Sequence, residues 1–108
     1  MAGTWASGDI VVAVEVCRDL VSLTQVVTDP AGHQSATRFA FLADGREHEV
    51  EGYDFVMKAS WIDVRTLDTT VTRGGAIVGS AKYALSEDGG SLGLTFGEQV
   101  VPFRRVRL

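Results

Sequence analysis

The chain has 108 residues, of which 45% are hydrophobic and 22% charged, with fourteen acidic and ten basic side chains and a formal net charge of −4. This length suits one domain, residues 1–108, with a core of its own, and the composition excludes a disordered chain. The acidic balance argues against nucleic acid and anionic membranes as partners. The first residues lack the features of a signal peptide, and no segment approaches the about 18 apolar residues of a membrane span, so we expect a cytoplasmic protein.

Turn signals rich in glycine, proline and aspartate recur along the chain and separate short segments rich in Val, Thr, Phe and Ile. This rhythm is typical of antiparallel hairpins. It predicts strands at 4–6, 9–17, 20–28, 34–42, 47–51, 55–63, 67–73, 76–85, 91–97 and 99–107.

The segment from Glu15 to Val27 is consistent with either two strands or a short helix. Its apolar residues also match a helical stripe, so a short helix at 17–23 is the alternative to two strands. The many β-branched residues in this window favour strands. Cys17, the only cysteine, excludes an intramolecular disulfide, and in this apolar segment we expect it to be buried.

About eight to ten short antiparallel strands with hardly a helix indicate an all-β sandwich or an up-and-down barrel. Long, valine-rich strands are aggregation hazards when their edges are open, and closure into a barrel removes the edges. We therefore predict a small antiparallel up-and-down β-barrel.

The start of the chain, Gly3-Thr4-Trp5, resembles the G-x-W signature of the calycins, the superfamily of lipocalin, fatty-acid-binding and avidin-like barrels. The resemblance implies that Trp5 closes the narrow end of the barrel and that an arginine of the last strand packs across its ring. Arg104 and Arg105 are the candidates for that arginine. A guanidinium stacked on an indole is a favourable cation–π pair.

A second likeness runs from Asp44 to Phe96 and resembles the short bacterial lipocalin-like domains. Three motifs carry it in order, namely I-D-x-R-T, a basic residue followed by G and V, and S-x-D-G-x-x-L with a later T. They fall on Ile62, Asp63, Arg65, Thr66, Arg73, Gly75, Val78, Ser86, Asp88, Gly89, Leu92 and Thr95. Residues 9–28 depart from the pattern. The resemblance implies a fold and a cavity but neither a catalytic residue nor a cofactor.

A barrel of this size is filled by side chains or holds one small ligand. Small residues in the same strands as the aromatic residues leave space, so core and pocket are both open interpretations. The expected pocket walls are Phe39, Phe41, Met57, Trp61, Tyr83 and Phe96. Trp61 also offers an N–H donor to a ligand.

Three carboxylates are weak candidates for acid–base chemistry. Glu15 interrupts an apolar strand and would have a raised pKa if it faced inward, although the alternation of Ile10 to Val16 favours an outward position. Asp63 shares a face with Trp61, but a turn cap beside Arg65 is the favoured interpretation. Asp54 is the third candidate.

The two histidines do not predict a metal site. His33 lies in a turn and His48 lies among glutamates, and neither has a second histidine or cysteine at metal-ligand spacing. We expect no metal and no cofactor.

Three functions remain open. The first is binding of a small, largely hydrophobic molecule inside a monomeric or homodimeric barrel. The second is a cofactor-independent cyclase or isomerase that holds a polyketide- or terpene-like substrate in a reactive conformation, with a carboxylate or a cavity tyrosine as acid–base group. The third is a filled barrel with a structural role.

Overall fold

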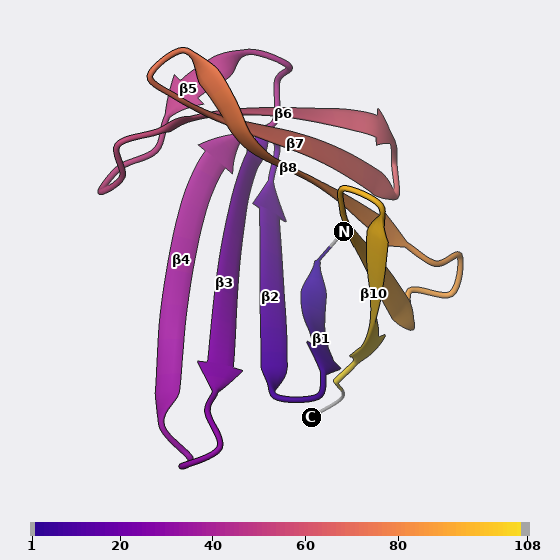
Figure 1. The fold of residues 1–108 in the computed structure, drawn as a ribbon. Coiled ribbons are helices and arrows are strands. Elements are labelled where there is room, and N and C mark those ends of the chain that lie inside the picture. Colours follow the sequence, from indigo (N-terminus) through magenta and orange to yellow (C-terminus); the bar gives the residue numbers. More distant parts are fainter. Residues whose placement is uncertain (1, 107–108) are drawn as a thin grey trace.

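The computed structural model describes residues 2–106 and contains ten β-strands in this part of the chain (Figure 1). Among the described residues, no helix is long and apolar enough to cross a membrane. The strands are β1 (Gly3–Ser7), β2 (Ile10–Cys17), β3 (Leu20–Thr28), β4 (Gln34–Leu42), β5 (Glu47–Glu49), β6 (Val56–Asp63), β7 (Thr66–Arg73), β8 (Ala76–Leu85), β9 (Ser91–Phe96) and β10 (Gln99–Arg105).

These strands lie close to the predicted segments. The stretch 17–23 is the β2–β3 hairpin, with Arg18 at its turn, so the helical alternative for this stretch is wrong. Strand β5 ends at Glu49, two residues before the predicted end. Strand β10 ends at Arg105, and the rest of the predicted segment includes Arg107, which lies outside the described residues.

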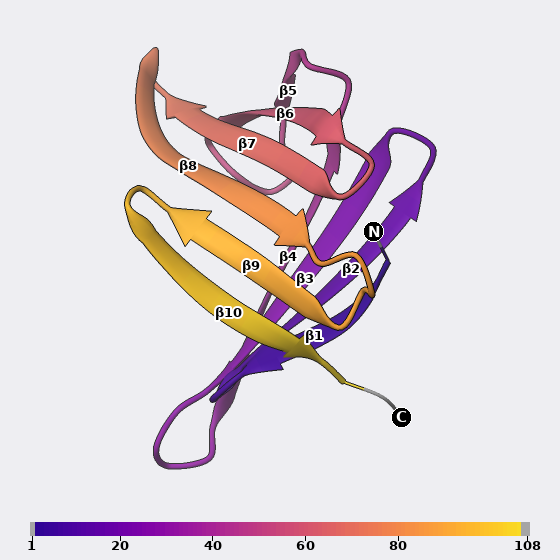
Figure 2. The same cartoon turned by 90° about the vertical axis from the view of Figure 1, so that its right-hand side faces the viewer.

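All ten strands form one antiparallel sheet in the order β4-β3-β2-β1-β10-β9-β8-β7-β6-β5. Strands that follow one another in the chain are paired, except β4 and β5, which form the two edges of the sheet, and β1 pairs with β10. The sheet curls so that β6, β7 and β8 cross over β2, β3 and β4, and β4 comes into contact with β6 (Figures 1 and 2). The chain is therefore a nearly closed up-and-down β-barrel, as predicted.

Alternation along the strands explains which residues form the core. In β2, Val12 and Val14 are buried, whereas Glu15 faces solvent. Cys17 is exposed, so the prediction of a buried thiol was wrong. The reason is the period of two, which places Cys17 on the same outer face as Glu15 at the end of the strand.

Trp5 closes one end of the barrel. Its side chain is 0% exposed, and its Nε1–H donates a hydrogen bond to the Gly89 carbonyl in the β8–β9 turn at 3.2 Å. The guanidinium carbon of Arg105 lies 5.5 Å from the centre of the indole, while the neighbouring Arg104 is exposed and pairs with Ala6. Arg105, and not Arg104, is thus the arginine that packs on Trp5.

Glycine is required where these groups meet. Gly3 has a φ of +147°, and a Cβ at this position would lie 2.9 Å from Nη2 of Arg105. Any larger residue at Gly3 would push the guanidinium away from the indole.

Candidate functional site

A cavity of about 360 Å³ lies between the two halves of the curled sheet. Strands β3 and β4 form one wall, and β6, β7 and β8 form the other. The lining residues are Leu23, Gln25, Phe39, Phe41, Phe55, Met57, Thr69, Val71, Arg73, Val78, Gly79, Ser80, Ala81, Tyr83 and Phe96. Most of them are apolar or aromatic, which is typical of pockets for small organic ligands.

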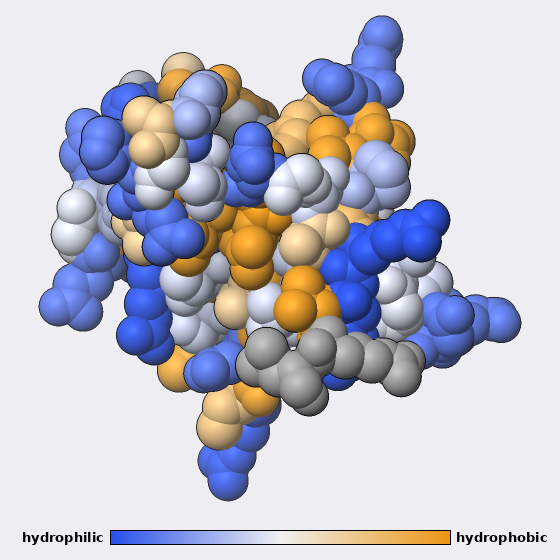
Figure 3. Space-filling view, turned by 90° about the horizontal axis from the view of Figure 1, so that it is seen from below, coloured by the Kyte–Doolittle hydropathy of each residue, from blue (hydrophilic) through white to orange (hydrophobic). Residues whose placement is uncertain are grey.

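The cavity opens at the end of the barrel opposite Trp5. Arg73 and Val78 flank the β7–β8 turn, whereas Trp5 is bonded to the β8–β9 turn, and β8 runs from one turn to the other. Figure 3 views the protein from the side of the β1–β2 and β3–β4 turns and shows hydrophobic side chains near the centre of this face, between hydrophilic side chains that project around them.

Cross-strand register assembles the walls. Leu23 lies opposite Phe39, and Met57 lies opposite Val71, which in turn lies opposite Gly79. Because directly opposed residues of antiparallel strands share a face, all five side-chain positions point into the cavity. A Cβ built at Gly79 would meet no atom within 4 Å, so the absence of a side chain at this position keeps the space open.

Aromatic rings close the seam between β4 and β6. The centroids of Phe39 and Tyr53 lie 4.9 Å apart, those of Tyr53 and Phe55 lie 5.1 Å apart, and those of Phe39 and Phe55 lie 6.0 Å apart. The Tyr53 hydroxyl also donates to the Arg38 carbonyl of β4 at 3.5 Å. The connection between β5 and β6 therefore contacts β4 through side chains. These contacts close the barrel on the side where β4 is not paired with β5 or β6.

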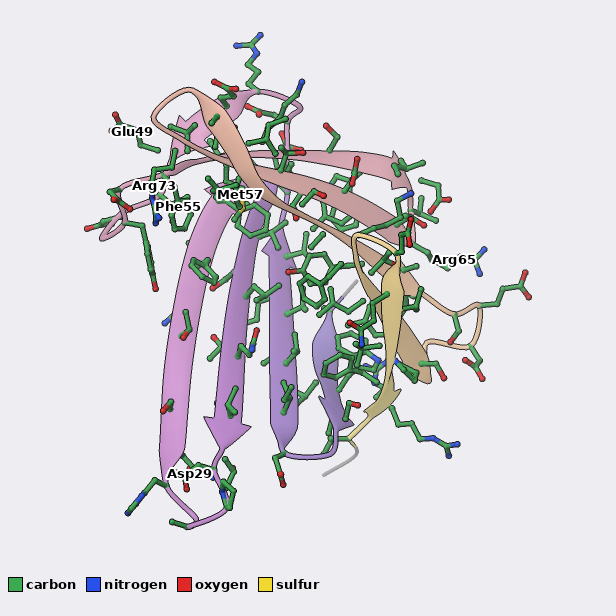
Figure 4. The ribbon with its side chains drawn as sticks, in the orientation of Figure 1. Asp29, Glu49, Phe55, Met57, Arg65 and Arg73 are labelled. Atoms are coloured by element: carbon green, nitrogen blue, oxygen red, sulfur yellow. The ribbon has the colours of Figure 1, made fainter. Side chains whose placement is uncertain are left out.

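The polar residues that line the cavity are Gln25, Thr69, Arg73, Ser80 and Tyr83. Thr69 Oγ1 donates to the Ala81 carbonyl at 3.0 Å and is thereby satisfied. The Tyr83 hydroxyl makes no hydrogen bond to any residue that the structure describes, and burial raises the pKa of this phenol above its usual 10.0. Arg73 pairs with Asp54, with 2.9 Å between Nη2 and Oδ1. Figure 4 shows Arg73 beside Phe55 and far from Arg65, which lies at the other end of β7.

Five of the six predicted wall residues line this cavity, namely Phe39, Phe41, Met57, Tyr83 and Phe96. Phe96 stays 49% exposed because it ends β9 at the open end. The sixth, Trp61, borders a shallow groove with Val16, Arg18, Asp19, Asp63 and Val64.

The position of Trp61 follows from its place along β6. It shares a face with Met57, but four residues of extended chain separate them by roughly 13 Å, which carries Trp61 toward the opposite end of the barrel. Alternation alone identifies the face of a strand and not the depth along the barrel. Trp61 is therefore no wall of this cavity.

Sequence reasoning missed eight lining residues, namely Leu23, Gln25, Phe55, Thr69, Val71, Arg73, Val78 and Ser80. The alternation did carry a signal for Arg73, because it falls on the face of Thr69 and Val71. Arg73 also lies next to a glycine turn, so the sequence was equally consistent with a side chain that points into solvent.

The three candidate carboxylates lie outside the cavity. Glu15 is exposed on the outer face of β2, and Asp54 is exposed in its ion pair with Arg73. Asp63 Oδ1 accepts a hydrogen bond from the Arg65 backbone N–H at 2.8 Å, and this bond is the main cause that lowers the pKa of Asp63. The favoured interpretation of Asp63 as a turn cap is thus observed.

The histidines pair with aspartates in turns. His48 Nε2 lies 2.8 and 2.9 Å from the two carboxylate oxygens of Asp44, and His33 Nδ1 lies 3.5 Å from Asp29 Oδ2. The Arg46 backbone N–H, followed by His48, lowers the pKa of Asp44. Within residues 2–106, no three His, Cys, Asp or Glu side chains are grouped so that they could hold a metal ion.

Together these features define a class of protein, a nearly closed ten-stranded antiparallel β-barrel with an apolar cavity that opens at one end. Comparison of the chain with protein-family models, with curated proteins and with solved structures found no match.

Proposed function

We propose that this protein binds a small, largely hydrophobic molecule in the cavity, in the manner of the lipocalin-like barrels that its sequence motifs resemble. The observation that carries the proposal is the apolar, aromatic-lined cavity of about 360 Å³ at the open end. Ligand pockets in proteins span roughly 300–1,000 Å³ and combine such walls with few polar groups. The volume suits one molecule of modest size.

The affinity would come from the apolar area that the ligand removes from water. The walls are preformed by strand pairing, so the protein loses little conformational entropy on binding. Among the polar residues of the lining, the Tyr83 hydroxyl and the Arg73 guanidinium are the groups that we expect to orient the ligand.

The cyclase or isomerase alternative has less support. Its three candidate carboxylates, Glu15, Asp54 and Asp63, all lie outside the cavity, so a reaction there would depend on Tyr83 and on the shape of the walls. A phenol with a raised pKa is a weak acid near neutral pH. The open cavity also supports ligand binding over a filled barrel with a purely structural role.

Titration with Nile red, a neutral dye whose emission shifts to the blue in apolar surroundings, tests the proposal. We expect saturable binding of one dye per chain. Val71→Thr places a hydroxyl on the cavity wall and should weaken binding several-fold, because the dye does not satisfy that hydroxyl. The matched control Val100→Thr makes the same change on the exposed outer face of β10 and should leave the affinity unchanged. Absence of saturable binding, or equal effects of the two substitutions, would contradict the proposal.

A further inference from the structure

The chemistry of the cavity opening indicates what kind of ligand the barrel takes. Among the described residues that line the cavity, Arg73 is the one with a charge, and the others are apolar or neutral polar residues. A guanidinium keeps its charge at every physiological pH and presents N–H donors in a fork that matches a carboxylate. Arg73 therefore brings a cationic group to the opening, next to an apolar interior.

The present partner of Arg73 is exchangeable. Asp54 belongs to the connection between β5 and β6, and it does not line the cavity. The side chains of Arg73 and Asp54 are 55% and 77% exposed, so water screens their attraction. Exposed ion pairs contribute little to stability, and a ligand anion at the opening would compete with Asp54 at small cost.

Tyr83 and Arg73, two of the polar residues that line the cavity, lie far apart along the strands. Tyr83 is paired with Leu67 near the start of β7, whereas Arg73 ends the same strand six residues later. Extended chain of that length spans roughly 20 Å. Val71 lies between these positions on β7, and Met57 lies opposite Val71 on β6. The strand register thus places Arg73 at the opening and Tyr83 toward the interior, with cavity-lining residues between them.

Building on the proposed function, we propose that the ligand is an elongated amphiphile with one carboxylate. The carboxylate pairs with Arg73 at the opening in place of Asp54, and the hydrocarbon chain extends along Val71 and Met57 toward Tyr83. This orientation leaves the charged group next to water and places only the apolar chain in the interior, which avoids the cost of burying a charge.

Displacement of Nile red by dodecanoate and by dodecan-1-ol at pH 7.4 tests the head group, with dodecanoate kept below its micelle concentration and dodecan-1-ol below its solubility limit. The two molecules share a chain and differ in charge. We expect dodecanoate to bind about tenfold more tightly, the size of effect expected from a charge-assisted pair. Arg73→Gln should abolish this preference and leave dodecan-1-ol within twofold. Arg38→Gln removes a charge from the outer face of β4, where Arg38 Nε donates to Ser22 Oγ, and should preserve the preference.

The outcomes separate the two proposals. If dodecanoate and dodecan-1-ol bind equally, or if Arg73→Gln keeps the preference, the carboxylate assignment is overturned while hydrophobic binding stands. If neither molecule nor the dye binds, the proposed function itself fails. Asp54→Asn supplies an independent check, because release of Arg73 from its partner should tighten dodecanoate binding and leave dodecan-1-ol unchanged. Unchanged dodecanoate binding in that variant would contradict the exchange of partners.

Bromine quenching tests the orientation. Tyr83→Trp introduces an indole in the interior, and its emission is taken as the difference from the parent protein. We expect 12-bromododecanoate, brominated at the end of its chain, to quench this emission more than 2-bromododecanoate, brominated beside the carboxylate. Stronger quenching by 2-bromododecanoate would overturn the orientation.

Discussion

Gly79 offers a direct way to fill the cavity from its wall. It lies opposite Val71 on the cavity face of β8, its φ is not in the left-handed region, and a Cβ there would meet no atom within 4 Å. Leucine at this position would therefore enter open space. We predict that Gly79→Leu both stabilises the protein and weakens binding of the dye.

The magnitudes follow from the geometry. A buried leucine side chain contributes about 1.5–3 kcal/mol, and removal of glycine from a strand adds about 0.5–1 kcal/mol. Because the cavity is open at one end, we expect the free energy of unfolding to rise by about 2 kcal/mol in total. For a domain of this size, that gain raises Tm by roughly 10 °C.

Binding should change in the opposite direction. Each ligand methylene excluded from the cavity forfeits about 0.8 kcal/mol, so exclusion of two lowers the affinity more than tenfold. Urea unfolding measures the first effect and Nile red titration the second. Ala84→Leu is the matched control, since it places the same side chain on the exposed outer face of β8 and should leave both quantities nearly unchanged.

Two results would refute this reasoning. If Gly79→Leu destabilises the protein, the space beside Gly79 is not open to a side chain. If Gly79→Leu leaves dye affinity unchanged, the dye binds elsewhere and the cavity is not the site.

Two further predictions concern the ends and turns of the barrel. Arg105→Gln should lower the free energy of unfolding by about 0.5–1 kcal/mol, because it removes the cation from the Trp5 ring. The control Arg104→Gln should change the free energy of unfolding by less than about 0.5 kcal/mol. Equal losses of the two variants in urea unfolding would contradict this role of Arg105. The pKa of Asp44 is lowered from 3.8 in the folded protein, so its contribution to stability is present above about pH 4 and is lost as the pH falls through the lowered pKa. Asp44→Asn should therefore make the acid-side decline of the free energy of unfolding less steep, and an unchanged decline would argue against this bond network.

Sequence patterns predicted most of the architecture because the start of a strand and its buried face are determined by neighbouring residues in the chain. Turn residues and alternation determine where a strand starts and which face is buried, as for Val12 and Val14 in β2. Cys17 shows that composition misleads when it is used in place of alternation. The apolar segment around Cys17 suggested a buried thiol, whereas alternation places Cys17 on the outer face together with Glu15. The partnership of Trp5 with Arg105 came from a family resemblance and not from the pattern.

The site was harder to predict because it depends on how far each residue reaches along the barrel. Met57 and Trp61 share a face of β6, yet only Met57 lines the cavity. Arg73 and Phe55 are assembled at the opening by the curl of the whole sheet, which brings β4 against β6. No short segment of sequence carries that information.

Native mass spectrometry of the protein isolated from its own source tests the central claim most directly, by comparing the intact mass before and after denaturation. If the cavity binds a small hydrophobic molecule, the native protein carries added mass from one molecule per chain. That mass disappears on denaturation and is carried by a smaller fraction of the Gly79→Leu variant. If the native protein has the mass of the bare chain and takes up neither Nile red nor dodecanoate, the cavity is not a ligand site.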